Sequence, residues 1–174
     1  MSGLKAFFGT KSIWAWEHWK PSGRSGAYAL NDAWEESNIT TDEGVTHALD
    51  VVFSGGAKKS AWYISLFNDD YTPLGSDTYQ SPGYTESSNN SQGARPTWQE
   101  AGVASKSITN AANVASFTMT ASETIYGGSL LSASTKGDSA SGEVMYCSSQ
   151  FTTSRDVEID DILKVTATIS GQDV

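Results

Sequence analysis

Cysteine and histidine are nearly absent from this sequence of 174 residues, which has one cysteine, Cys147, and two histidines, His18 and His47. A single cysteine excludes an internal disulfide bond. Zinc sites are built from several Cys and His side chains at close spacing, and neither histidine has a second His or Cys near it. No glycine-rich loop of the kind that cradles phosphate is present either. We therefore expect no metal site and no cofactor.

Positive charge is also scarce. The chain has 11 Lys and Arg against 20 Asp and Glu, which gives a net charge of −9. Because phosphate backbones are bound by clustered basic side chains, this balance argues against nucleic acid as a partner. An acidic surface suits a protein that stays soluble at high local concentration, or one that meets a basic partner.

Long hydrophobic runs are missing as well. No run approaches the roughly 20 apolar residues that a helix needs to cross a bilayer, so we expect no membrane partner. Residues 1–9 have one lysine and no apolar stretch of adequate length for a secretion signal. This predicts synthesis and folding in the cytoplasm.

Residues that form strands and turns are abundant. Only 18% of the residues are charged, and Ser, Thr, Gly and Ala are frequent, which favours strands and turns over surface helices. Segments typical of strands, separated by turn residues, lie at 61–67, 95–99, 105–109, 114–120, 124–132, 142–151 and 161–169. The pattern predicts a mainly β fold, an antiparallel β-sandwich or jelly roll with one short helix and an N-terminal arm.

One segment, residues 41–53, has the pattern of a helix, and it leads a domain that we place at residues 36–174. Thr40 and Glu43 fit a capping box. Gly55 follows the segment and fits a left-handed C-terminal cap. Residues spaced as i, i+3, i+4 and i+7 make one apolar stripe of Val45, Ala48, Leu49 and Val52. Because the helix is short and amphipathic, we expect this stripe to pack against the sheet.

Residues 1–35 differ from the rest of the chain because they hold four of its six tryptophans. These are Trp14, Trp16, Trp19 and Trp34. One interpretation is that the rings cover an edge of the core. The other is a Trp-rich N-terminal arm that docks onto another protein, since tryptophan is frequent among interface hot spots.

The segment 74–93 is a long polar loop, and loops of this length are often functional. Tyr79, Tyr84 and Trp98 lie in or beside it and could stack on a glycan or contact a partner. The alternative is that they pack the loop against the body. Asn68, Asp69, Asp70 and Asp77 could surround a calcium ion, but their spacing differs from that of the calcium-binding loop, and a hydrophilic turn is the alternative.

No set of catalytic residues is evident. The sequence has no Gly-x-Ser-x-Gly elbow for a serine nucleophile. Cys147 shares a strand face with Met145 and Phe151, which indicates a buried side chain. Adjacent acids on a strand point to opposite faces, so they do not converge on one bond. Such pairs are Glu35-Glu36, Asp69-Asp70 and Asp160-Asp161. We therefore expect a protein that is not an enzyme.

Several segments together resemble a family of small virion structural proteins of tailed bacteriophages. They are TDEG at 41–44, LDVVF at 49–53, WYISLF at 62–67, YTP at 71–73, RPTW at 95–98, ITNAA at 108–112, FTM at 117–119, TIYGG at 124–128, LLSAS at 130–134 and DILKVT at 161–166. The resemblance covers about residues 40–170. It implies a capsid decoration or cement role, and the family offers no catalytic residues to transfer.

Three functional hypotheses follow. The first is a decoration protein on the capsid surface of the virion, which bridges and stabilises subunits of the major capsid protein and is itself a homo-oligomer, a dimer or a trimer. The alternative is a tail-associated or receptor-binding protein that recognises host surface glycans. An enzyme such as a glycan hydrolase is the third and weakest hypothesis.

Overall fold

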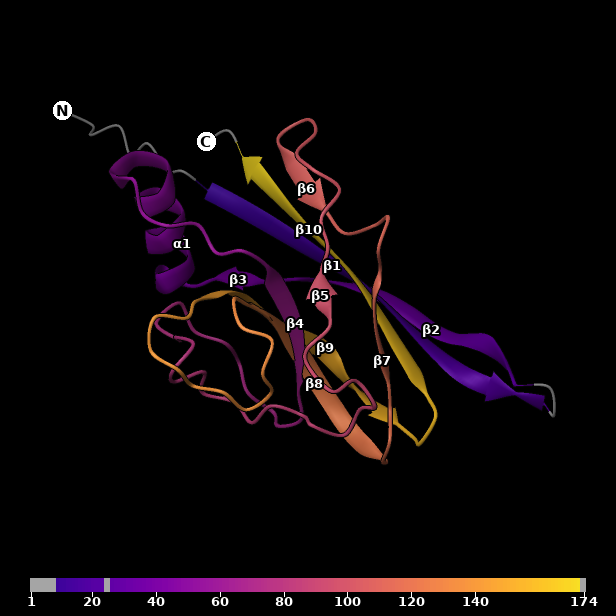
Figure 1. The fold of residues 1–174 in the computed structure, drawn as a ribbon. Coiled ribbons are helices and arrows are strands. Elements are labelled where there is room, and N and C mark those ends of the chain that lie inside the picture. The colour runs from indigo at the N-terminus through magenta and orange to yellow at the C-terminus, as the bar shows by residue number, and fades with distance from the viewer. Residues whose placement is uncertain (1–8, 24–25, 173–174) are drawn as a thin grey trace.

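Two antiparallel β-sheets form the body of the protein. The computed structural model describes residues 9–23 and 26–172. Strands account for 49% of the chain and helix for 9% (Figure 1). The predicted mainly β fold with one short helix is confirmed, and the arrangement is compatible with a β-sandwich.

Sheet A contains both ends of the described chain. Its strands follow the order β2-β1-β10-β6. The strand β7 also pairs with β10, at residues 162–165, whereas β6 pairs with residues 168–170. The bounds are β1 Gly9–Ser22, β2 Ala27–Ser37, β6 Ser107–Thr109, β7 Ala115–Thr118 and β10 Ile162–Gln172. Because β1 lies between β2 and β10, the first described strand is interior to the sheet.

Sheet B follows the order β3-β9-β8-β4-β5. Its bounds are β3 Ile39–Thr40, β4 Trp62–Phe67, β5 Thr97–Trp98, β8 Glu123–Leu131 and β9 Met145–Val157. Each strand predicted from the sequence overlaps one of the strands of the two sheets. The predicted strands do not include β1, β2 or β3, and the prediction placed the end of β9 too early.

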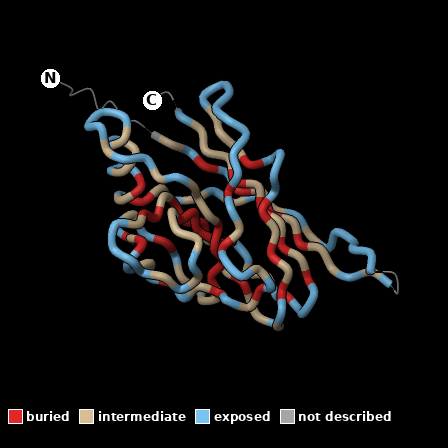
Figure 2. Tube along the Cα trace, in the orientation of Figure 1, coloured by how far each residue is buried: buried red, intermediate tan, exposed pale blue. Residues whose placement is uncertain are grey.

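The main core lies between the sheets (Figure 2). In β10 every second residue points into this core, because Leu163, Val165 and Ala167 are fully buried. In β1 the rings of Trp14 and Trp16 point the same way and are also buried. Their opposing neighbours from sheet B include Ile64, Leu66, Leu130, Cys147 and Phe151.

Sheet B is buried on both faces. Its second face carries Phe67, Leu131 and Met145, which pack with Tyr79 and Tyr84 into a smaller core. Both tyrosines come from the long connection between β4 and β5, so this connection covers the sheet. Gly127 allows the close packing there, since a Cβ on it would collide with the Phe67 ring and the Ser149 carbonyl.

The helix α1 spans Asp42–Leu49 and continues into a π-helical turn, η2, at Asp50–Ser54. Thr41 caps it, because its Oγ1 accepts a hydrogen bond from the Gly44 N–H at 3.0 Å. The predicted capping box is therefore wrong by one residue, since Thr40 belongs to β3. Glu43 instead accepts hydrogen bonds from the backbone N–H groups of Tyr79 and Met145. Within the described residues no helix is long and apolar enough to cross a membrane.

The apolar stripe of the helix does not pack as predicted. Val45, Leu49 and Val52 are exposed, and Val52 retains 65% of its accessible surface. The buried helical residue is Gly44, where a Cβ would lie 2.8 Å from the Cα of Tyr146. The helix thus approaches β9 through a glycine, and this contact turns most of its apolar side chains away from the sheet.

Candidate functional site

The four tryptophans predicted to dock onto a partner lie in three different environments. Trp14 and Trp16 are almost completely buried, with ring centroids 5.7 Å apart. Docking through these two residues is therefore wrong, because β1 is an interior strand and both rings belong to the core. Residues 1–8, 24 and 25 of the predicted arm lie outside the described residues, and the rest of it forms β1 and most of β2.

Trp34 lies at the margin of the core, on the inner side of β2. Its ring stacks on Trp16 with centroids 6.3 Å apart and meets Phe151 edge-on. The Arg155 guanidinium lies 4.2 Å above the same ring, and its Nε also lies 3.0 Å from Asp32. Trp34 is thus held from both sides and offers no free ring face.

Trp19 is the one predicted anchor on the outer face of sheet A. Its indole N–H donates to Glu17 at 2.8 Å, and the Lys164 ammonium lies 4.4 Å from the ring centroid. Glu17 and Lys164 are also direct neighbours in the pairing of β1 with β10. Both charged side chains therefore contact Trp19 on the same face of the sheet.

The predicted glycan-stacking rings are also buried. Trp98 lies in the main core, and its indole N–H donates to the Ala167 carbonyl at 3.0 Å. Tyr79 and Tyr84 belong to the smaller core under the long loop. Sugar stacking on these faces is wrong as predicted, because each ring face is already covered by protein.

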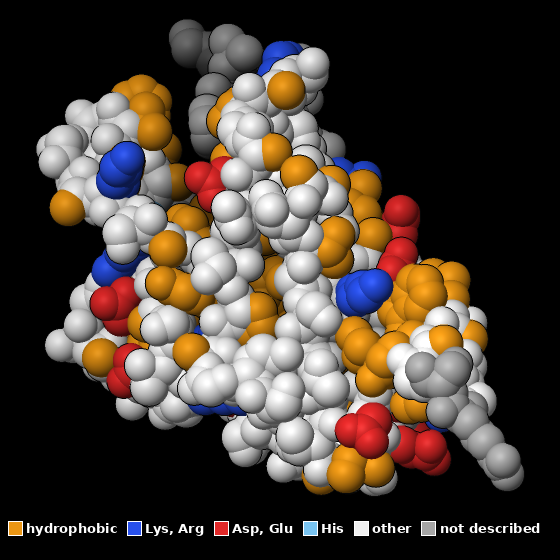
Figure 3. All heavy atoms as spheres, turned by 45° about the vertical axis from the view of Figure 1, so that its right-hand side comes forward, with side chains coloured by type: hydrophobic (Ala, Val, Ile, Leu, Met, Phe, Trp, Pro, Cys, Tyr) orange, Lys and Arg blue, Asp and Glu red, His pale blue; other side chains and the backbone are white. Residues whose placement is uncertain are grey.

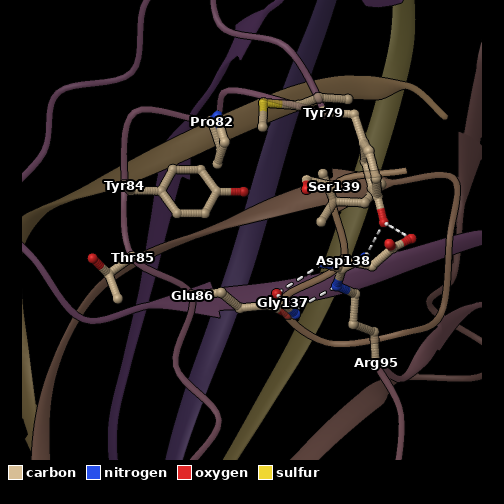
Figure 4. A pocket seen from close by; sticks show the side chains of 11 residues that line it. Tyr79, Pro82, Tyr84, Thr85, Glu86, Arg95, Gly137, Asp138 and Ser139 are labelled. Carbon is tan, nitrogen blue, oxygen red and sulfur yellow. Dashed lines mark hydrogen bonds and ion pairs between the residues drawn. The ribbon is translucent and has the colours of Figure 1, made fainter. Parts of the chain in front are cut away.

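Tyr79 and Tyr84 nevertheless line a cavity of about 320 Å³ (Figure 4). Arg95 is the centre of its polar wall. Its Nε and Nη2 each donate to Glu86 at 2.8 Å, and its Nη1 donates to the Tyr79 hydroxyl and the Ala133 carbonyl. The Tyr79 hydroxyl in turn donates to Asp138 at 3.0 Å. The Arg95 guanidinium therefore makes its hydrogen bonds to protein groups around the cavity.

The charges of this cavity are tightly held. Burial by itself would lower the pKa of Arg95, but the hydrogen bonds and the charge of Glu86 outweigh burial and raise it. Burial raises the pKa of Tyr79, and of Tyr84 to about 12. The Tyr84 hydroxyl is enclosed, and the side chains of Ser129 and Ser65 beside it only partly offset the effect of burial on its pKa. Asp138 does not contact Arg95, and its two oxygens accept hydrogen bonds from the Tyr79 hydroxyl and the Ala140 N–H.

His18 and Asp161 form a buried polar pair, which is the closest approach to a catalytic arrangement in the described residues. The Nε2 atom lies 2.7 Å from the Asp161 carboxylate. The other ring nitrogen faces the Asn31 amide at 3.3 Å, where a triad would require a serine. Both side chains are almost fully enclosed, so the pair ties β1 to the start of β10.

The remaining sequence candidates stabilise loops or the core. Asp69 accepts hydrogen bonds from the Thr85 N–H, and Asp77 accepts them from Tyr71 and the Leu74 N–H. Within the described part of the chain, no group of three or more His, Cys, Asp or Glu side chains could hold a metal ion. Cys147 is fully buried, and burial raises its pKa, which disfavours the thiolate.

The loops leave the outer face of sheet A uncovered, and we call it the open face. It lies opposite the buried Trp14 and Trp16 side of β1 and the Leu163 and Val165 side of β10. Its centre carries Ile13, Ala15, Val114, Ser116, Thr166 and Thr168. These side chains are short and uncharged, and with the charged Glu17 and Lys164 they surround a shallow hollow of about 310 Å³.

The β1–β2 hairpin extends past the sandwich (Figure 1). Beyond Trp19, β1 pairs only with β2, with Pro21 opposite Tyr28 and Lys20 opposite Ala29. We call residues Lys20, Pro21, Tyr28 and Leu30 the hairpin end. Leu30 is 50% exposed and Tyr28 39%, and Figure 3 shows apolar side chains gathered over this hairpin.

A wide groove of about 930 Å³ lies at the helix, and we call it the helix groove. The helix contributes Leu49, Asp50 and Phe53, and Val144 and Thr78 come from the facing loops. Phe53 is 73% exposed, the highest value among the large apolar side chains of the helix. The groove also has three more carboxylates at its wall, from Asp42, Glu43 and Glu143.

The chain matches no protein-family model and no curated protein. Function therefore has to be argued from the three exposed surfaces.

Sequence reasoning missed these surfaces for identifiable reasons. The open face is visible in the alternation of β10, where Lys164, Thr166 and Thr168 point away from the core. No local sequence feature distinguishes the open face from the covered face of sheet B, because the loop that covers sheet B is distant in the sequence. The helix groove could have been suspected from Phe53, which falls outside the stripe that the helical periodicity predicts.

Proposed function

We propose that the protein is a non-enzymatic capsid decoration protein, which lies on the major capsid protein with the open face of sheet A and bridges neighbouring subunits. The single observation that carries this proposal is the contrast between the two sheets. Sheet B has a hydrophobic core on each side, whereas sheet A presents an uncovered outer face with a shallow hollow lined mostly by short side chains. A sheet face of this kind suits contact with another regular surface.

The chemistry of the open face supports protein contact. Ile13 and Val114 are exposed at 38% and 43%, and the Thr and Ala side chains beside them cost little to desolvate. Glu17 and Lys164 face each other across β1 and β10, so docking would bury few unpaired charges. The resemblance to phage virion proteins supports the identity of the partner, and the net charge of −9 suits many copies at high local concentration.

The test is cosedimentation of the purified protein with empty capsids of the same virus. We expect saturable binding with a fixed number of copies per capsid subunit. Ile13→Lys combined with Thr166→Lys should abolish it, because two charges would be buried against the capsid. Leu74→Lys combined with Val103→Lys is the matched control, since both residues are exposed away from the open face. The wild-type protein staying in the supernatant at all capsid concentrations would overturn the proposal.

The second proposal is a tail-associated receptor-binding protein that recognises host glycans. The cavity of about 320 Å³ favours it, because the Asp138 carboxylate, which Arg95 does not bind, lies with Thr85 at its wall. Sugar hydroxyls donate to such acceptors. If this function holds, Asp138→Asn should weaken binding to glycans of the host surface, whereas Ile13→Lys with Thr166→Lys should leave it unchanged.

A further inference from the structure

Lys136 contacts an asparagine side chain instead of a carboxylate. Its ammonium donates to Asn90 Oδ1 at 2.7 Å and to the Asn90 carbonyl oxygen at 3.2 Å. Among the described residues Lys136 makes no ion pair, although the chain has 20 acidic residues. Asn90 belongs to the loop between β4 and β5, and Lys136 to the loop between β8 and β9. An amine and a primary amide thus meet where the two loops that line the cavity come together.

The surrounding contacts hold both side chains in place. Asn90 forms a β-bridge with Met119, which is fully buried, and Asn90 itself is only 7% exposed. Next to Lys136, the Gly137 N–H donates to the Glu86 carboxylate at 2.6 Å. The amine and the amide therefore face each other in a defined arrangement, which favours a reaction between two groups of one chain.

The environment of Lys136 favours its neutral form. Burial lowers the pKa of Lys136, and the charge of Glu86 only partly offsets this effect. A lysine amine that has lost its proton is a nucleophile. Because a C=O bond is about 1.23 Å long, Nζ lies at most about 4 Å from Asn90 Cγ. A small change in the Lys136 side-chain torsions therefore brings the amine to the amide carbon.

We propose that Lys136 and Asn90 form an isopeptide bond within the folded protein. The ammonium first gives one proton to water, and the Nζ lone pair then attacks Asn90 Cγ. As the Nζ–Cγ bond forms, the Cγ–Nδ2 bond breaks, and a proton passes from Nζ to the departing nitrogen. Ammonia leaves and takes up the proton from water as an ammonium ion. The reaction needs no oxidant, reductant or other reactant, and it goes beyond the proposed function because it requires no partner.

The bond joins the two loops covalently. It closes a loop of the chain between positions 90 and 136, which are 46 positions apart. A cross-link of this kind restricts the unfolded chain and so stabilises the folded one. The bond also removes the charge of Lys136, so the net charge changes from −9 to −10, one unit lower.

Mass spectrometry of the purified full chain tests the proposal. We expect a mass about 17 Da below that of the unmodified chain, because one molecule of ammonia is lost. Trypsin should then release residues 60–106 joined to residues 107–155. The first peptide stays whole because Pro96 follows Arg95, and the second because trypsin does not cut after a lysine whose amine is bonded.

Two variants make the test specific. Lys136→Arg keeps the positive charge but has no primary amine, and Asn90→Ala has no side-chain amide. Both should have the full mass, give separate peptides, and unfold at a lower urea concentration than wild type. Circular dichroism should show that both are folded, so that loss of the native fold cannot explain the missing bond. Lys59→Arg is the matched control, because Lys59 pairs with Glu143, and it should still lose ammonia.

Three outcomes would overturn the proposal. The first is the full mass in folded wild-type protein after prolonged incubation. The second is a loss of ammonia with separate tryptic peptides, which would mean that an asparagine has formed a succinimide instead. The third is a loss of ammonia that persists in Lys136→Arg, because no amine is then present at this position.

Discussion

The His18 imidazole and the Asp161 carboxylate lie 2.7 Å apart although 143 positions separate them in the sequence. The same carboxylate oxygen accepts a hydrogen bond from the Glu158 N–H at 2.9 Å, and Lys20 lies 3.9 Å away. One side chain thus fixes the turn before β10 and joins it to β1. Because Asp161 is only 1% exposed, its loss cannot be replaced by water without opening the sheet.

Asp161→Ala is expected to lower the free energy of unfolding by about 3 kcal/mol, because it leaves the His18 ring and the Glu158 N–H buried without an acceptor. Urea unfolding measures the effect. Glu158→Gln is the control, since Glu158 is 70% exposed and lies 3.8 Å from the same lysine. It should change stability by less than about 0.5 kcal/mol. Equal effects of the two substitutions would refute the structural role of the pair.

Gly44→Ala is expected to destabilise the protein by about 1–3 kcal/mol, because the new methyl group would collide with the backbone of Tyr146. The collision pushes α1 away from β9, so hydrogen exchange should increase in the helix before it increases in the sheets. Gly93→Ala is the control, because nothing lies within 4 Å of its added Cβ. Unchanged stability and exchange in Gly44→Ala would show that the helix can shift without cost.

The fold was largely predictable because most strands carry local signals. The alternation in β10, for example, follows from one covered and one open face. The strand β2 was missed because Ala27 to Leu30 extend beyond the sandwich and are all exposed. A strand without a buried face has no hydrophobic period to detect.

The candidate surfaces were less predictable because they depend on contacts between distant segments. The helical period placed Val45 and Val52 on one stripe, but only the contact of Gly44 with Tyr146 determines which side of the helix meets the sheet. Likewise, Trp14 and Trp19 look alike in the sequence. They differ because an interior strand presents successive residues to opposite faces, and only one of those faces is covered.

The two tyrosines of the small core provide a matched pair of substitutions. Tyr79→Phe removes a hydroxyl that bonds Arg95 and Asp138, and should cost about 1–3 kcal/mol because Arg95 is buried. Tyr84→Phe removes a buried hydroxyl whose polar neighbours are Ser65 and Ser129 and which makes no close hydrogen bond, so the loss of stability should be smaller, below about 1 kcal/mol. Urea unfolding at neutral pH compares them. A larger loss in Tyr84→Phe would mean that its hydroxyl has a partner, such as a bound water.

Tyr84 should also make the protein sensitive to alkali. Burial raises its pKa from 10.0 to about 12, so the unfolded chain ionises first as the pH rises. The contribution of the neutral phenol is fully present below pH 10 and is lost progressively between pH 10 and about 12. The loss should approach roughly 2 kcal/mol at the upper end of this window, since one pKa unit corresponds to about 1.4 kcal/mol.

Unfolding of wild type and Tyr84→Phe by urea, at pH 8 and at several values across that window, tests this dependence. The stability of the wild type should fall more steeply with pH than that of the variant. Some slope should remain in the variant, because burial also raises the pKa of Tyr71, Tyr79 and Tyr146. Parallel curves for the two proteins would show that the Tyr84 hydroxyl reaches solvent, in which case the long loop covers sheet B less tightly than its packing against Phe67 indicates.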